Sequence, residues 1–267
     1  MPQAQAPTQP LVLTRVEGHV GVLTLNSSAT MNTLDGPMLL AMEQGLQTLE
    51  SDAQVRVIVV TGADERTFMA GGNIAYMKEL RVLDYYETFS NLILRVFRRF
   101  EECPKPTIAA VNGWALGGGC EFMLTLDMRL MAEEAQIGLP EIKLGIFPGG
   151  GGTQRLIRQI PMCHAKQLLF TGDFVSADEA LSIGLVNRAV PRKDLMHEAM
   201  ALAARIASRS PSALRLLKRT VVQGAEMPLP TALAHEATAI ALLFDSEDAR
   251  ESMSAFLEKR EARITGR

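Results

Sequence analysis

The chain has 267 residues, of which 47% are hydrophobic and 21% charged, so it has enough apolar side chains for a sizeable core without disulfides or a structural metal. Its formal net charge of −3 at pH 7 gives no general attraction to nucleic acid, and we expect no nucleic-acid partner. No apolar run approaches the ~20 residues of a membrane span, so we expect no membrane partner either.

The first ten residues, MPQAQAPTQP, are polar and include three prolines. They lack the charged start and apolar run of a signal peptide, and the arginine-rich amphipathic helix of a mitochondrial presequence. We therefore predict a disordered tail over residues 1–10 and a cytoplasmic protein. Cys103, Cys120 and Cys163 lie far apart with no CxxC spacing, which predicts reduced thiols and not a disulfide framework or a zinc site.

Strand and helix patterns alternate over residues 11–193, which predicts an α/β core. Two runs that flank a Glu17-Gly18 turn signal predict a hairpin, and three later apolar runs predict further strands, the first of them buried on both faces. Between them, apolar residues at helical spacing cover residues 37–49, and Asp84 is predicted to cap a second helix. The predicted strands cover residues 11–15, 20–25, 55–61, 107–111 and 128–131.

The pattern changes to helices alone from about Asp194, so we predict a helical region over residues 194–267. Just before it, Ser176-Ala-Asp-Glu179 has the form of a capping box, and Gly184 suits the end of that helix. Within the region, helices are predicted to begin at Ser210-Pro211 and end at Gly224, and to cover residues 231–244 and 246–259.

Two glycine-rich segments directly follow predicted strands. Gly71-Gly72 stands in FMAGGN, and Gly117-Gly118-Gly119 stands in NGWALGGGCE, which opens a predicted helix. Glycine lets the backbone approach a ligand closely, and N–H groups at a helix start lack partners inside the helix. Two such N–H groups converging from different loops would form an oxyanion hole. Either segment alone also fits a purely structural role in a tight turn.

Several other catalytic motifs are missing from the sequence. Gly119 stands where a phosphate-binding loop requires lysine, and the later GIFPGGGG run also lacks that lysine. There is no strict GxGxxG, HExxH or GxSxG, and the four histidines are scattered. We therefore expect no metal site, and carboxylates remain as the candidate acids and bases.

Glu121 and Glu141 are the candidate carboxylates. Glu121 stands just inside the start of a predicted apolar helix, where the helix dipole favours the anion. Glu141 follows Leu139-Pro140 in a loop that enters an apolar stretch. Burial would raise the pKa of either carboxyl group, as acid–base work near neutral pH requires. By position alone, each glutamate also fits a structural role.

Six stretches carry a resemblance to a known family, in the family's order, from about Leu11 to the C-terminus. They are LNSSATMNTLD, FMAGGNIAYM, AAVNGWALGGGCEF, GLPEIKLGIFPGGGGTQRL, LLFTGDFVSADEALSIGLVN and ESMSAFLEKR. With nineteen residues between Glu121 and Glu141, the chain closely resembles the hydratases of the enoyl-CoA hydratase/isomerase (crotonase) superfamily. The resemblance implies a spiral of β-β-α units with a C-terminal helical region that drives trimerisation, often as a dimer of trimers.

The resemblance also implies roles for matching residues. Gly72 and Gly118 would donate backbone N–H groups to the thioester oxygen, Glu121 would activate water, and Glu141 would protonate the carbon next to the thioester. The coenzyme A part of an acyl-CoA substrate would contact Ala70, Gly71, Asn73, Ile74, Phe256 and Lys259. The implied activity is the reversible hydration of a 2-enoyl-CoA by a homotrimer or hexamer, with no metal or redox cofactor.

The sequence departs from the family pattern at two places, and it leaves alternative functions open. Asn73 stands where many relatives have Asp, and Ser27-Ser28-Ala29 replaces a basic run that contacts coenzyme A in some members. Double-bond isomerisation needs only Glu141, so the presence of Glu121 favours hydration. Another acyl-CoA lyase of the superfamily is a further alternative, whereas dehalogenase, decarboxylase and hydrolase relatives use other residue sets. A non-catalytic or RNA-binding member would carry a lysine-rich exposed helix, which the sequence lacks.

Overall fold

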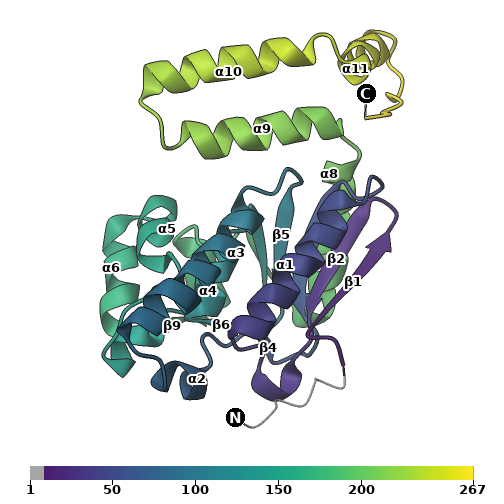
Figure 1. Ribbon diagram of the computed structural model, residues 1–267. Helices are drawn as coiled ribbons and strands as arrows, with labels where there is room; N and C mark the ends of the chain where they lie inside the picture. Colours follow the sequence, from purple (N-terminus) through teal and green to yellow (C-terminus); the bar gives the residue numbers. More distant parts are fainter. Residues whose placement is uncertain (1–8, 267) are drawn as a thin grey trace.

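The structure is a computed structural model that describes residues 9–266 (Figure 1). Two sheets lie in its core between helices, and a hairpin of two long helices, α9 and α10, extends above them. Most of the tail predicted for residues 1–10 therefore lies outside the described residues. Among residues 9–266, no helix is both long enough and apolar enough to cross a membrane.

The larger sheet has six strands in the order β1-β2-β3-β5-β7-β10. β1 and β2 form the predicted antiparallel hairpin, and the other neighbouring strands are parallel. All five predicted strands are confirmed to within two residues, whereas β10 was not predicted. The strands are β1 (Val12–Glu17), β2 (Val20–Leu25), β3 (Val57–Gly62), β5 (Thr107–Val111), β7 (Met128–Ala132) and β10 (Arg188–Val190).

A smaller sheet contains four short strands in the order β4-β6-β8-β9, and the first three run parallel. Each of those three follows a strand of the larger sheet along the chain, so the chain winds through repeated β-β steps as predicted. Because β4 pairs directly with β6, the two glycine-rich turns that follow them are neighbours. The strands are β4 (Thr67–Met69), β6 (Trp114–Leu116), β8 (Ile137–Gly138) and β9 (Phe174–Val175).

Helices cover both faces of the larger sheet, as parallel strands require. α1 (Gly36–Ser51) packs against β1, β2 and α3 (Asn91–Glu101), and α8 (Arg192–Ala207) packs against β3, β5 and β7. Asp35 caps α1, because its side chain accepts a 3.0 Å hydrogen bond from Met38 N. The helix predicted over residues 37–49 is therefore confirmed, and it extends slightly beyond the prediction at both ends.

The predicted cap at Asp84 is wrong. Leu83 already has helical backbone angles, with φ −70° and ψ −41°, and the π-helical segment η2 (Asp84–Ser90) runs directly into α3. Asp84 therefore lies inside the helical segment, where Oδ2 accepts a 3.4 Å hydrogen bond from Arg81 N. The core-facing residues of this segment and α3 are buried, namely Phe89, Ile93, Val96, Phe97 and Phe100.

The fully buried helix α4 (Gly118–Met123) begins at the second glycine turn. Its Phe122 ring packs against Phe68, Phe97 and Phe100, with centroid separations of 6.1, 5.4 and 4.8 Å. Aromatic side chains bury large apolar areas and pack in preferred geometries, so this cluster fixes the helix firmly in the core. Glu121, the preceding residue, is held in place with it.

Several short helical segments connect the strands and the longer helices. The capping box of α7 is confirmed, since Ser176 and Glu179 exchange hydrogen bonds as predicted. Gly184 follows that helix with φ +77°, a left-handed conformation suited to glycine. These short elements are η1 (Ser28–Thr30), α2 (Ile74–Lys78), η3 (Pro140–Leu144), α5 (Gly152–Gln159), α6 (Met162–Thr171) and α7 (Ala177–Ser182).

Beyond α8 the described chain is helical only. α9 (Pro211–Gly224) and α10 (Leu229–Leu243) lie antiparallel to each other, and α11 (Glu247–Leu257) follows beyond them (Figure 1). The three predicted helices are confirmed, and Ser210 and Ser246 cap the first and the last. Near the start of this helical arm, Lys218 on α9 forms a 2.7 Å ion pair with Asp127 of the core.

Candidate active site

A cavity of about 220 Å³ opens where β4, β6 and η3 meet the loop before α5. The predicted residues that line it come from separate segments of the chain: Ala70, Gly71, Gly72, Ile74, Gly118, Glu121 and Glu141. Its other walls are mainly apolar side chains, among them Met77, Tyr85, Phe89 and Ile93. Two carboxyl groups in a mostly apolar cavity favour a site for acid–base chemistry on an apolar ligand.

The two glycine turns touch each other at the wall of this cavity. Gly71 has φ +92° and Gly117 has φ +52°, left-handed conformations that side chains disfavour. A Cβ atom at Gly71 would lie 3.6 Å from Gly118 N, and one at Gly118 would lie 3.8 Å from the Gly71 backbone. A Cβ atom at Gly71 would also lie 3.0 Å from the Leu116 carbonyl oxygen, and one at Gly118 would lie 2.6 Å from Leu34 Cδ1, so both positions are crowded for a residue with a side chain.

The backbone N–H groups of Gly72 and Gly118 have no acceptor within the part of the chain that the structure describes, so they can bind a ligand. Gly118 is the first residue of α4, where the N–H group has no partner inside the helix. Among the hydrogen bonds of residues 9–266, neither N–H group acts as a donor. Since both glycines line the cavity, the turns have the form of an oxyanion hole.

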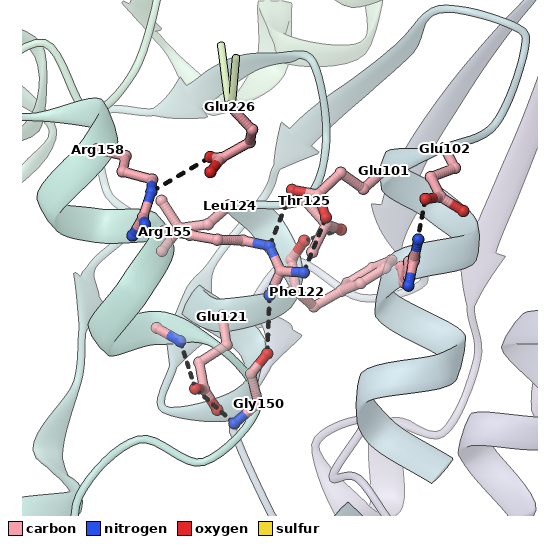
Figure 2. A network of polar contacts seen from close by, with 12 residues as sticks. Glu101, Glu102, Glu121, Phe122, Leu124, Thr125, Gly150, Arg155, Arg158 and Glu226 are labelled. Carbon is pink, nitrogen blue, oxygen red and sulfur yellow. Dashed lines mark hydrogen bonds and ion pairs between the residues drawn. The ribbon is translucent and has the colours of Figure 1, made fainter. Parts of the chain in front are cut away.

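Glu121 is almost completely buried, with 4% of its surface exposed. Its Oε1 atom accepts hydrogen bonds from Gly150 N and Gly152 N, both at 2.7 Å (Figure 2). Burial raises the pKa of this carboxyl, while the two backbone N–H groups and the nearby Arg155 charge oppose that rise. The donors stabilise the ionised form and fix the direction of the carboxylate.

Glu141 has a different environment. Its Oε2 atom is buried and has no hydrogen-bond partner among the described residues. Burial, followed by the charge of Glu121, raises the pKa of Glu141 to about 7. A Cβ atom at Gly117 would lie 2.9 Å from Glu141 Oε1, so this carboxyl reaches the turn that carries Gly118.

The structure adds functional candidates that sequence reasoning did not identify. The Gly149–Gly152 run, to which sequence reasoning assigned no role in the site, supplies both donors to Glu121. Its glycines are needed there, because a Cβ atom at Gly150 would lie 2.9 Å from Glu121 Oε2. Tyr85 also lines the cavity, and burial and the charges of both glutamates raise its pKa. The run of four glycines before a helix was the available signal.

The structure does not bring all predicted coenzyme A contacts to the cavity. Asn73 is not one of the residues that line it, and its side chain caps α2 by accepting a 3.2 Å hydrogen bond from Tyr76 N. Phe256 and Lys259 also do not line it. Figure 1 shows the reason, since the α9–α10 hairpin carries α11 to the end of the molecule opposite α2. Within one chain, Phe256 and Lys259 therefore do not line the cavity, and their contact with coenzyme A stays a prediction.

Comparisons with known proteins agree with this geometry. Residues 15–267 match the sequence model of the family described as enoyl-CoA hydratase/isomerase. A short-chain-enoyl-CoA hydratase of Clostridium acetobutylicum is 44% identical over 93% of this chain and 95% of its own. A crotonyl-CoA hydratase of Syntrophomonas wolfei is 42% identical over 94% and 96%. The crystal structure of an enoyl-CoA hydratase from Bacillus anthracis has a TM-score of 0.92 and 36% identity, covering 96% of this chain and all of that one. The predicted α/β fold is confirmed.

Proposed function

The chain belongs to the enoyl-CoA hydratase/isomerase family, and on that basis we propose that it catalyses the reversible addition of water to a 2-enoyl-CoA, giving a 3-hydroxyacyl-CoA. One observation carries the proposal: Glu121, Glu141, Gly72 and Gly118 line a single cavity. A binding scaffold has no need of one buried and one partly buried carboxyl group beside two N–H groups that have no acceptor among the described residues. The enzyme is thus a hydro-lyase that acts on an acyl-CoA thioester.

The Gly72 and Gly118 N–H groups hold the thioester carbonyl oxygen. When water attacks the β-carbon, the electron pair of the carbon–carbon double bond moves toward this oxygen and forms an enolate. Donors already in place stabilise the developing charge without reorganisation, and losing one such donor typically lowers the rate by about 10²–10³-fold. The two touching turns therefore supply the electrophilic half of the reaction.

The two glutamates move the protons. Glu121, whose ionised form is stabilised by Gly150 N–H and Gly152 N–H, takes a proton from the attacking water. Glu141, which holds its proton near neutral pH, gives that proton to the α-carbon. The pair carries one proton before and after turnover, and this proton returns from Glu121 to Glu141 to reset the site. Hydration involves no net oxidation or reduction, and we infer that no redox cofactor or metal is needed.

The direct test is to replace each carboxyl group by its neutral isostere. Glu121→Gln and Glu141→Gln should each lower the rate of crotonyl-CoA hydration by about 10²–10⁴-fold, because each removes one proton-transfer group. The loss of ultraviolet absorbance of the conjugated thioester measures the rate, and circular dichroism checks the fold. Full hydration activity in Glu121→Gln would favour the isomerase function, in which Glu141 alone shuttles the proton.

We infer that the acyl chain is short. The cavity is small for a substrate pocket at about 220 Å³, and Tyr85, Phe89 and Ile93 form part of its apolar wall. The relatives named for short-chain and crotonyl substrates support the same inference.

We also propose that the chain assembles as a homotrimer, alone or paired as a hexamer. The α9–α10 hairpin exposes large apolar side chains that water disfavours and a second copy would cover. These are Leu217, Val221, Leu229, Leu233, Ile240, Leu242 and Phe244. In such an assembly, Phe256 and Lys259 would contact the coenzyme A bound by a neighbouring copy. Support for this comes from Phe256, which is 83% exposed on α11, beyond the hairpin.

We propose a cytoplasmic location for this enzyme. Cys103 and Cys120 are buried free thiols, and Cys163 is a free thiol on the surface. A reducing compartment keeps such thiols intact. Cell fractionation with an antibody to the protein would test this proposal.

A further inference from the structure

Arg155 on α5 makes three hydrogen bonds beside the active site. Nε and Nη2 donate to the two carboxyl oxygens of Glu101 on α3, at 3.0 and 2.9 Å. Nη1 donates to the Gly150 carbonyl oxygen at 3.0 Å. Figure 2 shows Arg155 between Glu101 and the loop that reaches Glu121. Because one carboxylate holds the guanidinium at two nitrogens, the orientation of the guanidinium is fixed, and its third nitrogen points at the Gly150 carbonyl oxygen.

The carbonyl group that Arg155 binds belongs to the same short loop that donates both hydrogen bonds to Glu121. Along the chain, the Gly150 C=O group stands between the Gly150 and Gly152 N–H groups, and both of these donate to Glu121 Oε1 at 2.7 Å. This loop has no side chains of its own to hold it, and Gly151 has φ +107°. A Cβ atom at Gly151 would collide with Arg155 Nη1, so the loop lies directly on the guanidinium.

We propose that Arg155, held by Glu101, is a positioning residue that fixes the Gly149–Gly152 loop so that Gly150 and Gly152 donate to Glu121. This inference rests on the proposed hydratase function. Arg155 touches no reacting atom, and it acts through the peptide groups of the loop. Without this contact, the glycine loop gains conformational freedom and the two donors leave Glu121 Oε1 for part of the time.

The consequence is electrostatic as well as geometric. The charged and titratable groups around Glu121 are Arg155, Glu141, Tyr85 and the Cys120 thiol. Of these, Arg155 is the cation whose charge lowers the pKa of Glu121. Removing this charge and loosening both N–H donors would raise that pKa further. The ionised base would then be lost at a higher pH as the solution is acidified.

The same helix offers a matched control. Arg158 lies one turn beyond Arg155 on α5 and forms a 3.3 Å ion pair with Glu226, in the segment between α9 and α10. Its guanidinium also donates to Gln154, and it makes no hydrogen bond to the glycine loop among the described residues. Arg158→Gln therefore removes a charge and an ion pair from α5 without touching the donors to Glu121.

The test measures kcat, KM and the pH profile of crotonyl-CoA hydration for Arg155→Gln, Arg155→Lys, Glu101→Gln and Arg158→Gln. Arg155→Gln should lower kcat by about 10–100-fold and leave KM nearly unchanged. The fall in rate on the acidic side of its pH profile should begin at a higher pH than in the wild type. Arg155→Lys should recover part of kcat, Glu101→Gln should have a smaller effect, and Arg158→Gln should match the wild type. Equal kcat and acidic limbs in Arg155→Gln and Arg158→Gln would overturn the proposal.

A second readout does not need turnover. Hydrogen exchange followed by mass spectrometry on the peptide that contains Gly150 and Gly152 should be faster in Arg155→Gln than in Arg158→Gln. Unchanged exchange overturns the positioning role, even if the natural substrate differs from crotonyl-CoA. An inactive wild type instead overturns the proposed function alone. If Arg155→Gln does not fold, Arg155→Lys takes its place, and wild-type kcat together with wild-type exchange in that variant also overturns the role.

Discussion

At the scale of single residues, Glu121 and Glu141 carry the same group in different surroundings. Glu121 accepts two hydrogen bonds from backbone donors, whereas Glu141 Oε2 has no partner among the described residues. Hydrogen bonds to a carboxylate favour its ionised form, and burial without them favours the protonated form. The two environments therefore fit the proposed roles of Glu121 as the base and Glu141 as the acid.

The pH dependence of hydration follows from this pair. Burial raises the pKa of Glu141 from 4.5 to about 7, so its acid form is present below that pH and is lost as the pH rises through it. We expect kcat/KM for crotonyl-CoA hydration to fall above about pH 7, and to fall again in acid as Glu121 takes up a proton. Stopped assays across the pH range measure both limbs.

The reverse reaction provides the control. Dehydration of 3-hydroxybutyryl-CoA uses the same pair with its single proton on Glu121, so its kcat/KM should follow the same profile. A hydration rate that stays level from neutral to alkaline pH would contradict the role of Glu141 as the acid.

At the scale of elements, the π-helical segment η2 shapes one wall of the cavity. Its Tyr85 and Phe89 both line the cavity, and the two rings pack edge to face at 6.1 Å. A Cβ atom at Gly149 would collide with the Tyr85 hydroxyl, so Tyr85 closes against the glycine loop. Segments of this kind often occur at functional sites, because the wider turn redirects side chains.

Shortening Tyr85 should therefore lengthen the accepted acyl chain. In Tyr85→Ala, kcat/KM for six- and eight-carbon 2-enoyl-CoA esters should rise about tenfold relative to crotonyl-CoA, because space opens for additional methylene groups. The matched control is Tyr86→Ala, since Tyr86 is the adjacent residue and is 66% exposed. The same chain-length preference in both variants would show that Tyr85 does not set it.

Sequence patterns predicted elements better than they predicted contacts. The hairpin, the five strands, the capping box of α7 and the Ser210 cap of α9 depend on residues close together in the chain, and each is confirmed. Asp84 was misplaced because an N-cap signal does not reveal that the preceding residues are already helical. The contacts of Glu121 with Gly150 and of Arg155 with Glu101 join residues 29 and 54 positions apart, which no local pattern encodes. The pairing of Glu121 with Glu141 came from family resemblance.

At the scale of the whole molecule, the direction of the helical arm separates the cavity from α11. The sequence indicates helices there, but it does not say where the hairpin points. The sequence predicts that Phe256 and Lys259 contact coenzyme A, whereas the arm carries α11, which contains Phe256, away from the cavity of its own chain (Figure 1). The exposed apolar side of α9 and α10 makes assembly the natural explanation for this arrangement.

A charge on this surface should disrupt the proposed assembly. Leu233→Glu on α10 should shift the protein from trimers or hexamers to monomers, as sedimentation velocity would show, and should raise KM for acyl-CoA substrates. Leu40→Glu on α1 is the control, because Leu40 is 52% exposed and Leu233 is 54% exposed. Monomers in the wild type, or intact oligomers in Leu233→Glu, would exclude the α10 surface as the interface.

The direct pairing of β4 with β6 has a consequence for how this enzyme can change over evolution. In the proposed mechanism, the two amides that hold the thioester oxygen follow strands joined by a main-chain ladder, whereas Met77, Tyr85, Phe89 and Ile93 reach the cavity from helical segments outside that ladder. Mutations can therefore alter which substrates are accepted while the common chemical step stays intact. Such a division of labour lets a lineage acquire new substrates one side chain at a time.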